Sequence, residues 1–278
     1  MKNFLVRTAS SVVFVLLMLL ATLWHPIAFA AVFGFILVVM EYEYWNITVG
    51  ARFRKEKLLI AAASLFLFGA AFLQRYGCPL DLGQLLLFVL FPVGFFILQL
   101  YNKDQEAFKQ YPYLLLPILY MALPFSLFHL FWDINASGYS GVIVLGILIL
   151  LWCSDAGAYI FGTLFGQKNG HRLFPSISPK KSWEGFFGGL ATSVLAGFVM
   201  HKINIFPFGL IHSMVLGALV ASFGTWGDLV ESQIKRNFGV KDSGKIMPGH
   251  GGMLDRFDAL FISAPIAFIT IMIYNQLF

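Results

Sequence analysis

Charged residues are scarce in this sequence. Lys, Arg, Asp and Glu make up 12% of its 278 residues, whereas about 25% is usual for a soluble globular domain. The chain has no hydrophilic run long enough for a separate soluble domain, and no low-complexity segment or obvious internal repeat. These absences exclude a soluble globular protein. They favour a single membrane domain over residues 1–278, with N-terminal helices over about 1–135 and C-terminal helices and cytoplasmic loops over about 140–278.

Cysteine is also rare. Cys78 and Cys153 lie in different predicted helical regions and have neither disulfide nor zinc-site spacing. We interpret both as packing residues. The basic residues form no basic-aromatic module of the kind that binds nucleic acid, so no nucleic-acid partner is expected.

Apolar residues dominate the chain instead. They make up 59% of it, and the mean hydropathy is +0.78. Near-spanning apolar runs, each close to the roughly 20 residues that cross a bilayer core, cover about 5–24, 26–42, 58–75, 82–101, 111–131, 140–162, 184–201, 207–228 and 257–277. The sequence therefore predicts an all-α polytopic membrane protein with about nine transmembrane helices.

The first two runs permit two interpretations. Lys2, Arg7 and the triplet 28–30 imitate a signal peptide with its cleavage site. However, the apolar sequence continues directly through 31–40. We therefore expect two retained helices with a break at His25-Pro26, because proline commonly marks such a break.

The positions of the basic residues predict the orientation in the membrane. With a cytoplasmic N-terminus, 17 of the 19 Lys and Arg residues fall on the cytoplasmic side, against only Arg75 and Lys202 outside. This asymmetry favours the N-terminus inside and the C-terminus outside. The polar loops 166–183 and 229–256 then both face the cytoplasm.

The segment 228–258 is unusually rich in ionisable residues. Its 31 positions hold five of the 14 acids and five of the 19 basic residues. Asp228, Ser232 and either Lys235 or Arg236 are spaced to share one face of a helix that leaves the membrane. A solvated helix end with basic residues near its C-terminus is the simpler alternative.

A glycine-rich loop follows that helix. Gly244, Gly249, Gly251 and Gly252 bracket His250, and such a loop ahead of a helix exposes backbone N–H groups that can bind phosphate. Asp255 and Asp258 then open the last helix on one face, where capping and first-turn roles are the simpler alternatives. Carboxylates suit Mg²⁺ and the neighbouring cations suit phosphate, so the segment predicts magnesium-dependent phosphate chemistry.

The same segment resembles a known family signature. Ser232-Gln-Ile-Lys-Arg236, Lys241-Asp-Ser-Gly244 and Pro248-Gly-His-Gly-Gly-Met-Leu-Asp-Arg-Phe-Asp258 closely match the phosphatidate cytidylyltransferases, also called CDP-diacylglycerol synthases. Met247 is a conservative departure from the usual Leu, Ile or Phe. The segments 178–185 and 154–159 also resemble the family, whereas residues 1–140 carry no matching motif.

The resemblance implies roles for individual residues. Asp228 and Asp255 would bind a dinuclear metal site that contains Mg²⁺ and a second metal of unknown identity, and Lys235 and Arg236 would join them as catalytic residues. Asp258 would either bind metal or orient Arg256. The residues implied in substrate binding are Lys180, Lys181, Ser182, Ser232, Lys241, Asp242, Lys245, His250, Gly251, Gly252 and Arg256.

Several polar residues lie outside the signature. An unpaired carboxylate within an apolar run costs about 3 kcal/mol, so Asp155 is expected to face the interior or a wet cavity, as a partner for a cation of the site. Lys180 and Lys181 are either membrane anchors or phosphate ligands, and Ser182 is available to cap the seventh helix. Glu41 and Glu43 suggest an interfacial belt with their aromatic neighbours, and His129 shows no ligand spacing.

The resemblance implies that CTP and phosphatidic acid react to CDP-diacylglycerol and pyrophosphate. It also implies a homodimer in a bacterial inner membrane, with membrane lipids around it and the active site facing the cytoplasm. A CTP-dependent transferase for another lipid phosphate or a polyprenol remains open. A transporter would place charged residues near the membrane midplane, and only Asp155 does so.

Overall fold

The computed structural model describes residues 2–102, 104–135, 138–167, 170–249 and 251–277. The chain forms two compact units. Unit 1 holds Met1–Tyr139 and the later segment Asp242–Arg256, and unit 2 holds Ser140–Lys241 and Phe257–Phe278. The glycine-rich loop of the signature therefore belongs to the unit built by the N-terminal helices.

Helices of membrane-spanning length account for most of the chain. Among the described residues, the spans long and apolar enough to cross a membrane number eight: Pro26–Thr48, Arg54–Tyr76, Leu82–Leu100, Ala107–Leu130, Val142–Gly166, Trp183–Lys202, Leu210–Asn237 and Leu254–Gln276. The first expected run, 5–24, is also helical, but its apolar part Ser10–Leu23 is shorter than the others. The predicted all-α polytopic fold is confirmed.

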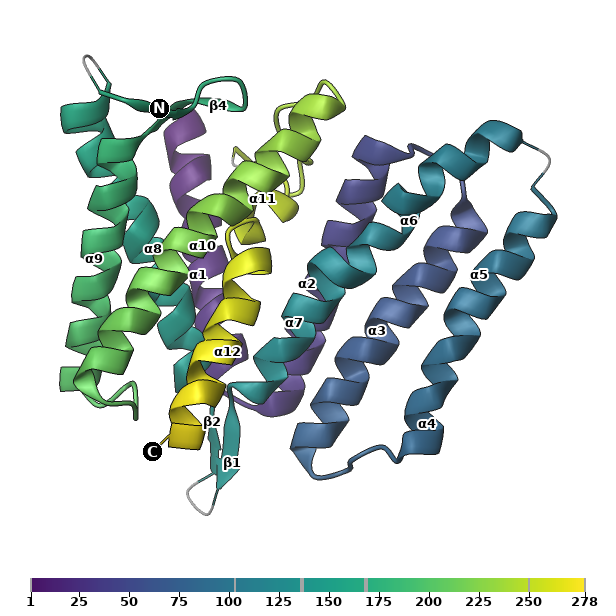
Figure 1. Ribbon diagram of the computed structural model, residues 1–278, viewed down its shortest axis with the longest axis horizontal. Coiled ribbons are helices and arrows are strands. Elements are labelled where there is room, and N and C mark those ends of the chain that lie inside the picture. The colour runs from purple at the N-terminus through teal and green to yellow at the C-terminus, as the bar shows by residue number, and fades with distance from the viewer. Residues whose placement is uncertain (1, 103, 136–137, 168–169, 250, 278) are drawn as a thin grey trace. The chain divides into compact units, whose positions relative to one another are not determined.

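Unit 1 is made of helices drawn in purple to teal in Figure 1. Its elements are α1 (Lys2–Leu23), α2 (Pro26–Thr48), α3 (Arg54–Tyr76), α4 (Leu82–Leu86), η1 (Leu87–Val89), α5 (Leu90–Leu100), η2 (Gln105–Gln110), α6 (Tyr111–Pro117), η3 (Ile118–Ala122), α7 (Leu123–Leu127), η4 (Phe128–Leu130) and β1 (Asp133–Asn135). The strand β2 (Gly138–Ser140) pairs with β1 where the first unit ends.

The break between α1 and α2 falls at the expected His25-Pro26. The imidazole Nδ1 of His25 accepts a hydrogen bond from the backbone N–H of Ile27 at 3.2 Å. Pro26 occupies the first position of α2, where a missing N–H costs nothing. The predicted break is confirmed.

Prolines shape the winding of another span in unit 1. The segment from α6 to η4 changes from α-helix to the π-helical η3 and back, and it ends in a 3-10 turn. Pro117 and Pro124 lie at these changes. Because proline donates no N–H and crowds the carbonyl four residues earlier, the two prolines account for the irregular winding.

The core of unit 1 is aromatic. Phe29, Phe33, Phe125 and Phe128 are fully buried, and the rings of Phe29 and Phe33 stack with centroids 4.2 Å apart. His129 is buried among these rings, where its Nδ1 accepts a hydrogen bond from the Trp132 indole at 3.1 Å. This histidine packs in the core, as its lack of ligand spacing suggested.

Unit 2 is drawn in teal, green and yellow in Figure 1. Its elements are α8 (Val142–Phe161), η5 (Gly162–Gly166), β3 (Arg172–Phe174), β4 (Ser178–Ser182), α9 (Trp183–Lys202), α10 (Leu210–Asn237) and α12 (Leu260–Leu277). The short α11 (Leu254–Phe257) lies where the chain passes from unit 1 to unit 2.

Small residues let the helices of unit 2 pack closely. A Cβ at Gly157 of α8 would lie 2.8 Å from the carbonyl oxygen of Gly188 on α9, and one at Gly227 of α10 would lie 2.7 Å from the carbonyl oxygen of Asp258. Such glycines allow backbones to approach in helix pairs within membranes. They hold α8, α9 and α10 together around the polar residues described below.

The loop expected over 166–183 contains a small antiparallel sheet. Arg172 pairs with Ser182 and Phe174 pairs with Ser178. The backbone N–H of Trp183 donates to the carbonyl of His171 at 2.9 Å and extends the pairing to the start of α9. The lysines 180 and 181 therefore lie on a strand, whereas the sequence indicated only a polar loop.

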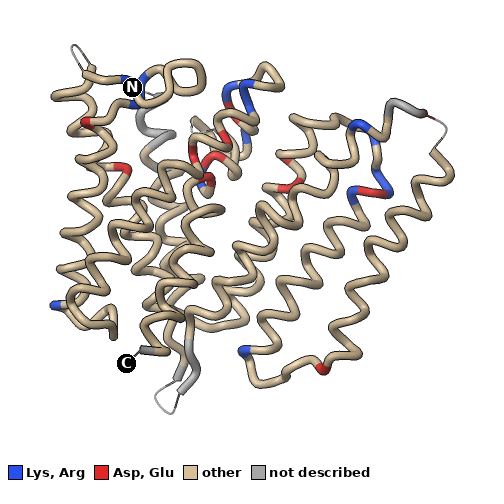
Figure 2. Tube along the Cα trace, viewed as in Figure 1, with Lys and Arg blue, Asp and Glu red and all other residues tan. Residues whose placement is uncertain are grey.

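Charged residues gather mainly at one end of the helices within each unit (Figure 2). In unit 1 Arg52 lies in the turn between α2 and α3, and Arg54 and Lys55 lie in the first turn of α3, whereas Arg75 lies in its last turn. In unit 2 charges lie on β4 and in the last turns of α10, and Lys202 lies in the last turn of α9. The orientation in the membrane stays a prediction.

Candidate active site

Unit 2 contains a cavity lined by both charged and apolar side chains. Its volume is about 460 Å³. The lining comes from α8, η5, the β3–β4 hairpin, α9 and α10: Asp155, Ala158, Tyr159, Gly162, Thr163, Gln167, Leu173, Lys180, Lys181, Ser182, Gly185, Phe186, Gly224, Thr225 and Asp228. Charged side chains thus share one cavity with small, aromatic and aliphatic ones.

An ion pair joins two walls of this cavity. The Nζ of Lys181 on β4 lies 2.5 Å from Oδ2 of Asp228 on α10. The other carboxylate oxygen of Asp228 accepts a hydrogen bond from the hydroxyl of Ser232 at 3.2 Å. The predicted common helical face of Asp228 and Ser232 is confirmed, and Lys181 is brought to it from the upstream motif.

The start of α9 positions the lysine strand. Ser182 caps this helix, because its buried Oγ accepts a hydrogen bond from the backbone N–H of Gly185 at 3.2 Å. Glu184 accepts hydrogen bonds from the backbone N–H of His171, at 3.0 Å, and contacts its ring. The predicted cap at Ser182 is confirmed, and it holds the end of β4 beside the cavity.

Asp155 and Lys180 also line the cavity. Asp155 is exposed on α8 although its helix is apolar, which agrees with the expected wet surroundings of an intramembrane carboxylate. Lys180 is exposed as well. Both charges can therefore meet a ligand that enters the cavity.

Lys235 and Arg236 are neighbours with different environments. Lys235 is buried and forms an ion pair with Glu231 one turn earlier, with only 9% and 2% of the two side chains exposed. Arg236 is exposed and donates from Nη1 to the carbonyl of Val240 at 2.9 Å. Arg236 is thus the accessible cation of the predicted pair, whereas Lys235 already has a buried carboxylate as its partner.

Acidic groups surround this end of α10. Asp258 follows α11 and is half-buried, and its Oδ1 accepts a hydrogen bond from the N–H of Ala259 at 2.7 Å. The negative charges of Asp228, Glu231 and Asp155 all act on it. Because like charges repel over such distances, this group of carboxylates favours a cationic partner.

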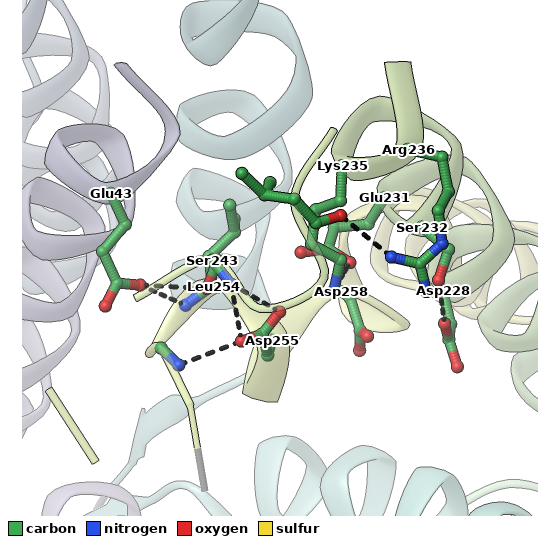
Figure 3. Close-up of polar contacts among 12 residues, drawn as sticks. Glu43, Asp228, Glu231, Ser232, Lys235, Arg236, Ser243, Leu254, Asp255 and Asp258 are labelled. Atoms are coloured by element: carbon green, nitrogen blue, oxygen red, sulfur yellow. Dashed lines mark hydrogen bonds and ion pairs between the residues drawn. The ribbon is translucent and has the colours of Figure 1, made fainter. Parts of the chain in front are cut away.

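The glycine-rich loop in unit 1 folds around Asp255 (Figure 3). The Oδ2 of Asp255 accepts hydrogen bonds from the backbone N–H of Ser243 at 3.0 Å and of Gly252 at 2.9 Å. Met247 and Gly251 pair across the loop, and Gly249 and Gly251 have positive φ angles of 76° and 93°. The N–H of Gly252, one of the glycines expected to expose N–H groups for phosphate, is thus donated to Asp255.

The remaining predicted residues lie around this loop. Lys241, Asp242, Lys245 and Arg256 are exposed. His250 lies outside the described residues. Asp255 and Arg256 belong to unit 1, whereas Asp228 and Asp258 belong to unit 2. The metal-binding role of the aspartates and the role of Asp258 toward Arg256 stay predictions.

The interpretation of Glu41 and Glu43 as an interfacial belt is wrong. Both side chains are buried in unit 1, with 0% and 3% of their surface exposed. The Oε2 of Glu43 accepts a hydrogen bond from the backbone N–H of Leu254 at 2.8 Å (Figure 3). The cost that assigned Asp155 to polar surroundings applies equally to acids in the apolar α2, and this signal could have identified Glu43.

The fold and site define an integral membrane protein with a cavity lined by both charged and apolar side chains. The family model of the "Cytidylyltransferase family" matches residues 5–274. The chain belongs to this family. This is the family that the resemblance of the segment 228–258 indicated.

Relatives that carry the name "Phosphatidate cytidylyltransferase" match a shorter part of the chain. Those of Staphylococcus epidermidis and Staphylococcus saprophyticus are 39% identical over 165 residues, and that of Staphylococcus aureus is 37% identical over 165 residues. Each match covers 59% of this chain and 60% of the relative. The chain thus matches about three fifths of the length of these relatives.

Proposed function

We propose that this protein transfers the cytidylyl group of CTP to phosphatidic acid and forms CDP-diacylglycerol and pyrophosphate. The observation that carries the proposal is the Lys181–Asp228 pair in a cavity lined by both charged and apolar side chains. A lipid phosphate likewise combines a charged head with apolar chains. Family membership and the named relatives support the nucleotide and lipid assignments.

The proposed reaction requires no dedicated general base. A phosphate oxygen of phosphatidic acid attacks the α-phosphorus of CTP, a new P–O bond forms, and the bond to the β-phosphate breaks to release pyrophosphate. Phosphate monoesters are largely ionised at neutral pH, so the nucleophile needs no proton removed. The protein's contribution is then to position two anions and to neutralise their charge.

Lys180 and Lys181 are suited to that neutralisation. Both line the cavity, and Lys181 is held over Asp228 from a strand that the Ser182 cap joins to α9. Arg236, which is exposed at the end of α10, is a further cation for the nucleotide phosphates. We assign the lipid phosphate to the two lysines and the triphosphate to Arg236 and the loop cations.

We further propose Mg²⁺ as the metal, with Asp228 and Asp255 as ligands. Mg²⁺ is usually held by one or two carboxylates together with substrate phosphates and water. When bound, the ion supplies charge stabilisation at the transferring phosphate.

The experiment gives purified protein labelled CTP, Mg²⁺ and phosphatidic acid, and it detects CDP-lipid and pyrophosphate in equal amounts. Parallel reactions replace phosphatidic acid with an ether-lipid phosphate or a polyprenyl phosphate. Product only with phosphatidic acid is expected. Product only with another acceptor would assign that acceptor, and not phosphatidic acid, as the substrate. No product from folded protein with any acceptor would overturn the proposal.

We also propose that the N-terminus and the site face the cytoplasm of a bacterial inner membrane, and that two copies form a homodimer. The distribution of Lys and Arg supports the orientation, and the family resemblance alone supports the dimer. Labelling Cys78, which is exposed at the opposite end of α3 from the Arg52–Lys57 cluster, tests the orientation. A reagent that does not cross membranes should reach it from outside intact cells.

A further inference from the structure

Glu43 is a buried acid in the part of the chain without a recognised motif. It lies in α2, within a helix that is otherwise largely apolar, and 3% of its surface is exposed. A carboxylate buried in this way requires hydrogen-bond donors. All the described donors to it come from the segment 242–256, about 200 positions later in the chain.

Those contacts attach the glycine-rich loop to α2. The Oε2 of Glu43 accepts from the backbone N–H of Leu254 at 2.8 Å and from the hydroxyl of Ser243 at 3.4 Å. The backbone N–H of Ser243 donates in turn to Asp255. One residue of the loop is therefore bound by two carboxylates, one structural and one a predicted metal ligand (Figure 3).

Two signature glycines lie directly against Glu43. A Cβ at Gly244 would lie 2.7 Å from the Cδ of Glu43, and a Cβ at Gly252 would lie 2.6 Å from its Oε2. Neither glycine has a positive φ angle, so backbone strain does not explain the residue type. The close approach of the Glu43 side chain, joined at Gly252 by the Ser243 hydroxyl, explains it, because only glycine leaves that space free.

A second N-terminal contact acts on the same loop. The hydroxyl of Ser10 on α1 donates to the carbonyl of Pro248 at 3.1 Å.

The Oε1 of Glu43 is buried and has no hydrogen-bond partner among the described residues. The carboxylate is therefore oriented by its Oε2 contacts to the loop.

We propose that Glu43 is a positioning residue, which holds the loop 242–256 against α2 and thereby fixes the carboxylate of Asp255. The proposal rests on the proposed function only in the role of Asp255. It assigns a part in the site to the N-terminal helices, where the sequence shows no motif. Because the loop requires a hydrogen-bond acceptor, Glu43→Gln should keep most of the attachment of the loop to α2. Glu43→Ala should lose it.

The rate of trypsin cleavage reports how firmly the loop is held, and it requires no assay of enzyme activity. Lys245 is exposed within the loop, and Lys55, which is exposed in the first turn of α3, is an internal control. Losing hydrogen bonds to a charged acceptor should speed cleavage after Lys245 by about tenfold or more in Glu43→Ala, with cleavage after Lys55 unchanged. Equal cleavage after Lys245 in wild type and Glu43→Ala would overturn the proposal. Ser243→Ala, which removes only the side-chain donor, gives a smaller change in the same direction if Glu43→Ala cannot be purified.

A double-mutant cycle tests the packing of the glycines. Gly244→Ala should loosen the loop in the wild-type background, because the new Cβ meets Glu43. In the Glu43→Ala background the same change should add little, since the clashing atoms are gone. Gly69→Ala, whose Cβ would meet nothing within 4 Å, is the matched control. Additive effects of Gly244→Ala and Glu43→Ala would contradict the proposed contact.

Kinetics separate positioning from simple stability. We expect folded Glu43→Ala to need more Mg²⁺ for half-maximal rate and to show a raised KM for CTP, with Glu43→Gln restoring both. Unchanged constants in the folded fraction would show a merely structural role. If wild-type protein makes no CDP-lipid, the proposed function fails, while the cleavage and the cycle still decide the role of Glu43.

Discussion

The Nζ of Lys181 lies 2.5 Å from Oδ2 of Asp228. The two side chains are half-buried, with 26% and 34% of their surface exposed, and ion pairs that solvent can reach contribute about 1 kcal/mol or less to stability. The pair joins a strand of the hairpin to the end of α10 within one unit. Because its effect on stability is small, we expect its residues to matter mainly for ligand binding.

Lys181→Ala should therefore leave folding nearly intact and weaken catalysis. By analogy with removing one preorganised charge-stabilising donor, kcat/KM should fall about 100-fold, while the thermal midpoint changes little. Measurements of kcat/KM for CTP and for phosphatidic acid, made separately, identify the substrate affected. Lys202→Ala at the other end of α9 is the matched control. Unchanged kinetics for both substrates would make Lys181 a membrane anchor.

Asp228→Asn and Asp255→Asn should each remove nearly all Mg²⁺-dependent turnover in folded protein, because neutral amides are weaker ligands for Mg²⁺. The assay is a titration of Mg²⁺ at saturating CTP. Ser222→Ala on the same helix, which removes only the hydrogen bond from its hydroxyl to the carbonyl of Ala218, serves as a control and should retain most of the activity. Wild-type rates in either Asn variant would exclude that aspartate as an essential ligand.

The spans were largely predictable because long apolar runs determine where a chain can cross a bilayer. The expected run 58–75 became α3 (Arg54–Tyr76), and the break at His25-Pro26 followed from one proline. The β3–β4 hairpin was missed, since strands of three and five residues are too short to show a periodic pattern.

The site was predictable only in part. The helical spacing of Asp228 and Ser232 is local, so sequence alone indicated their contact. Asp228 pairs with Lys181, and Leu254 donates to Glu43. In both cases the partner comes from a distant segment of the chain. A spacing rule does not reach across such separations, and the cost of an acid within an apolar helix, which could have indicated a partner for Glu43, was not applied to it.

Gly157→Ala tests the close packing that holds the cavity walls. The added Cβ would lie 2.8 Å from the carbonyl of Gly188, a backbone atom that cannot turn aside. Overpacking of this kind costs about 1 to 3 kcal/mol, which equals or exceeds the roughly 1 kcal/mol that alanine adds to helix propensity. We expect a lower thermal midpoint, with Gly69→Ala in α3 as the unstrained control. A midpoint at or above that of wild type would show that α8 and α9 can separate without cost.

Lys235 provides the sharpest test between a structural and a catalytic cation. Because Lys235 is buried against Glu231, Lys235→Met should leave an uncompensated charge and cost about 3 to 5 kcal/mol. Adding Glu231→Gln should recover much of that stability, as denaturation of the single and double variants would show. Turnover in the refolded double variant then decides the role: recovered activity means that Lys235 only neutralises Glu231, whereas a stable but inactive protein means that Lys235 contacts the reacting phosphates. A Lys235→Met variant as stable as wild type would contradict the buried pair itself.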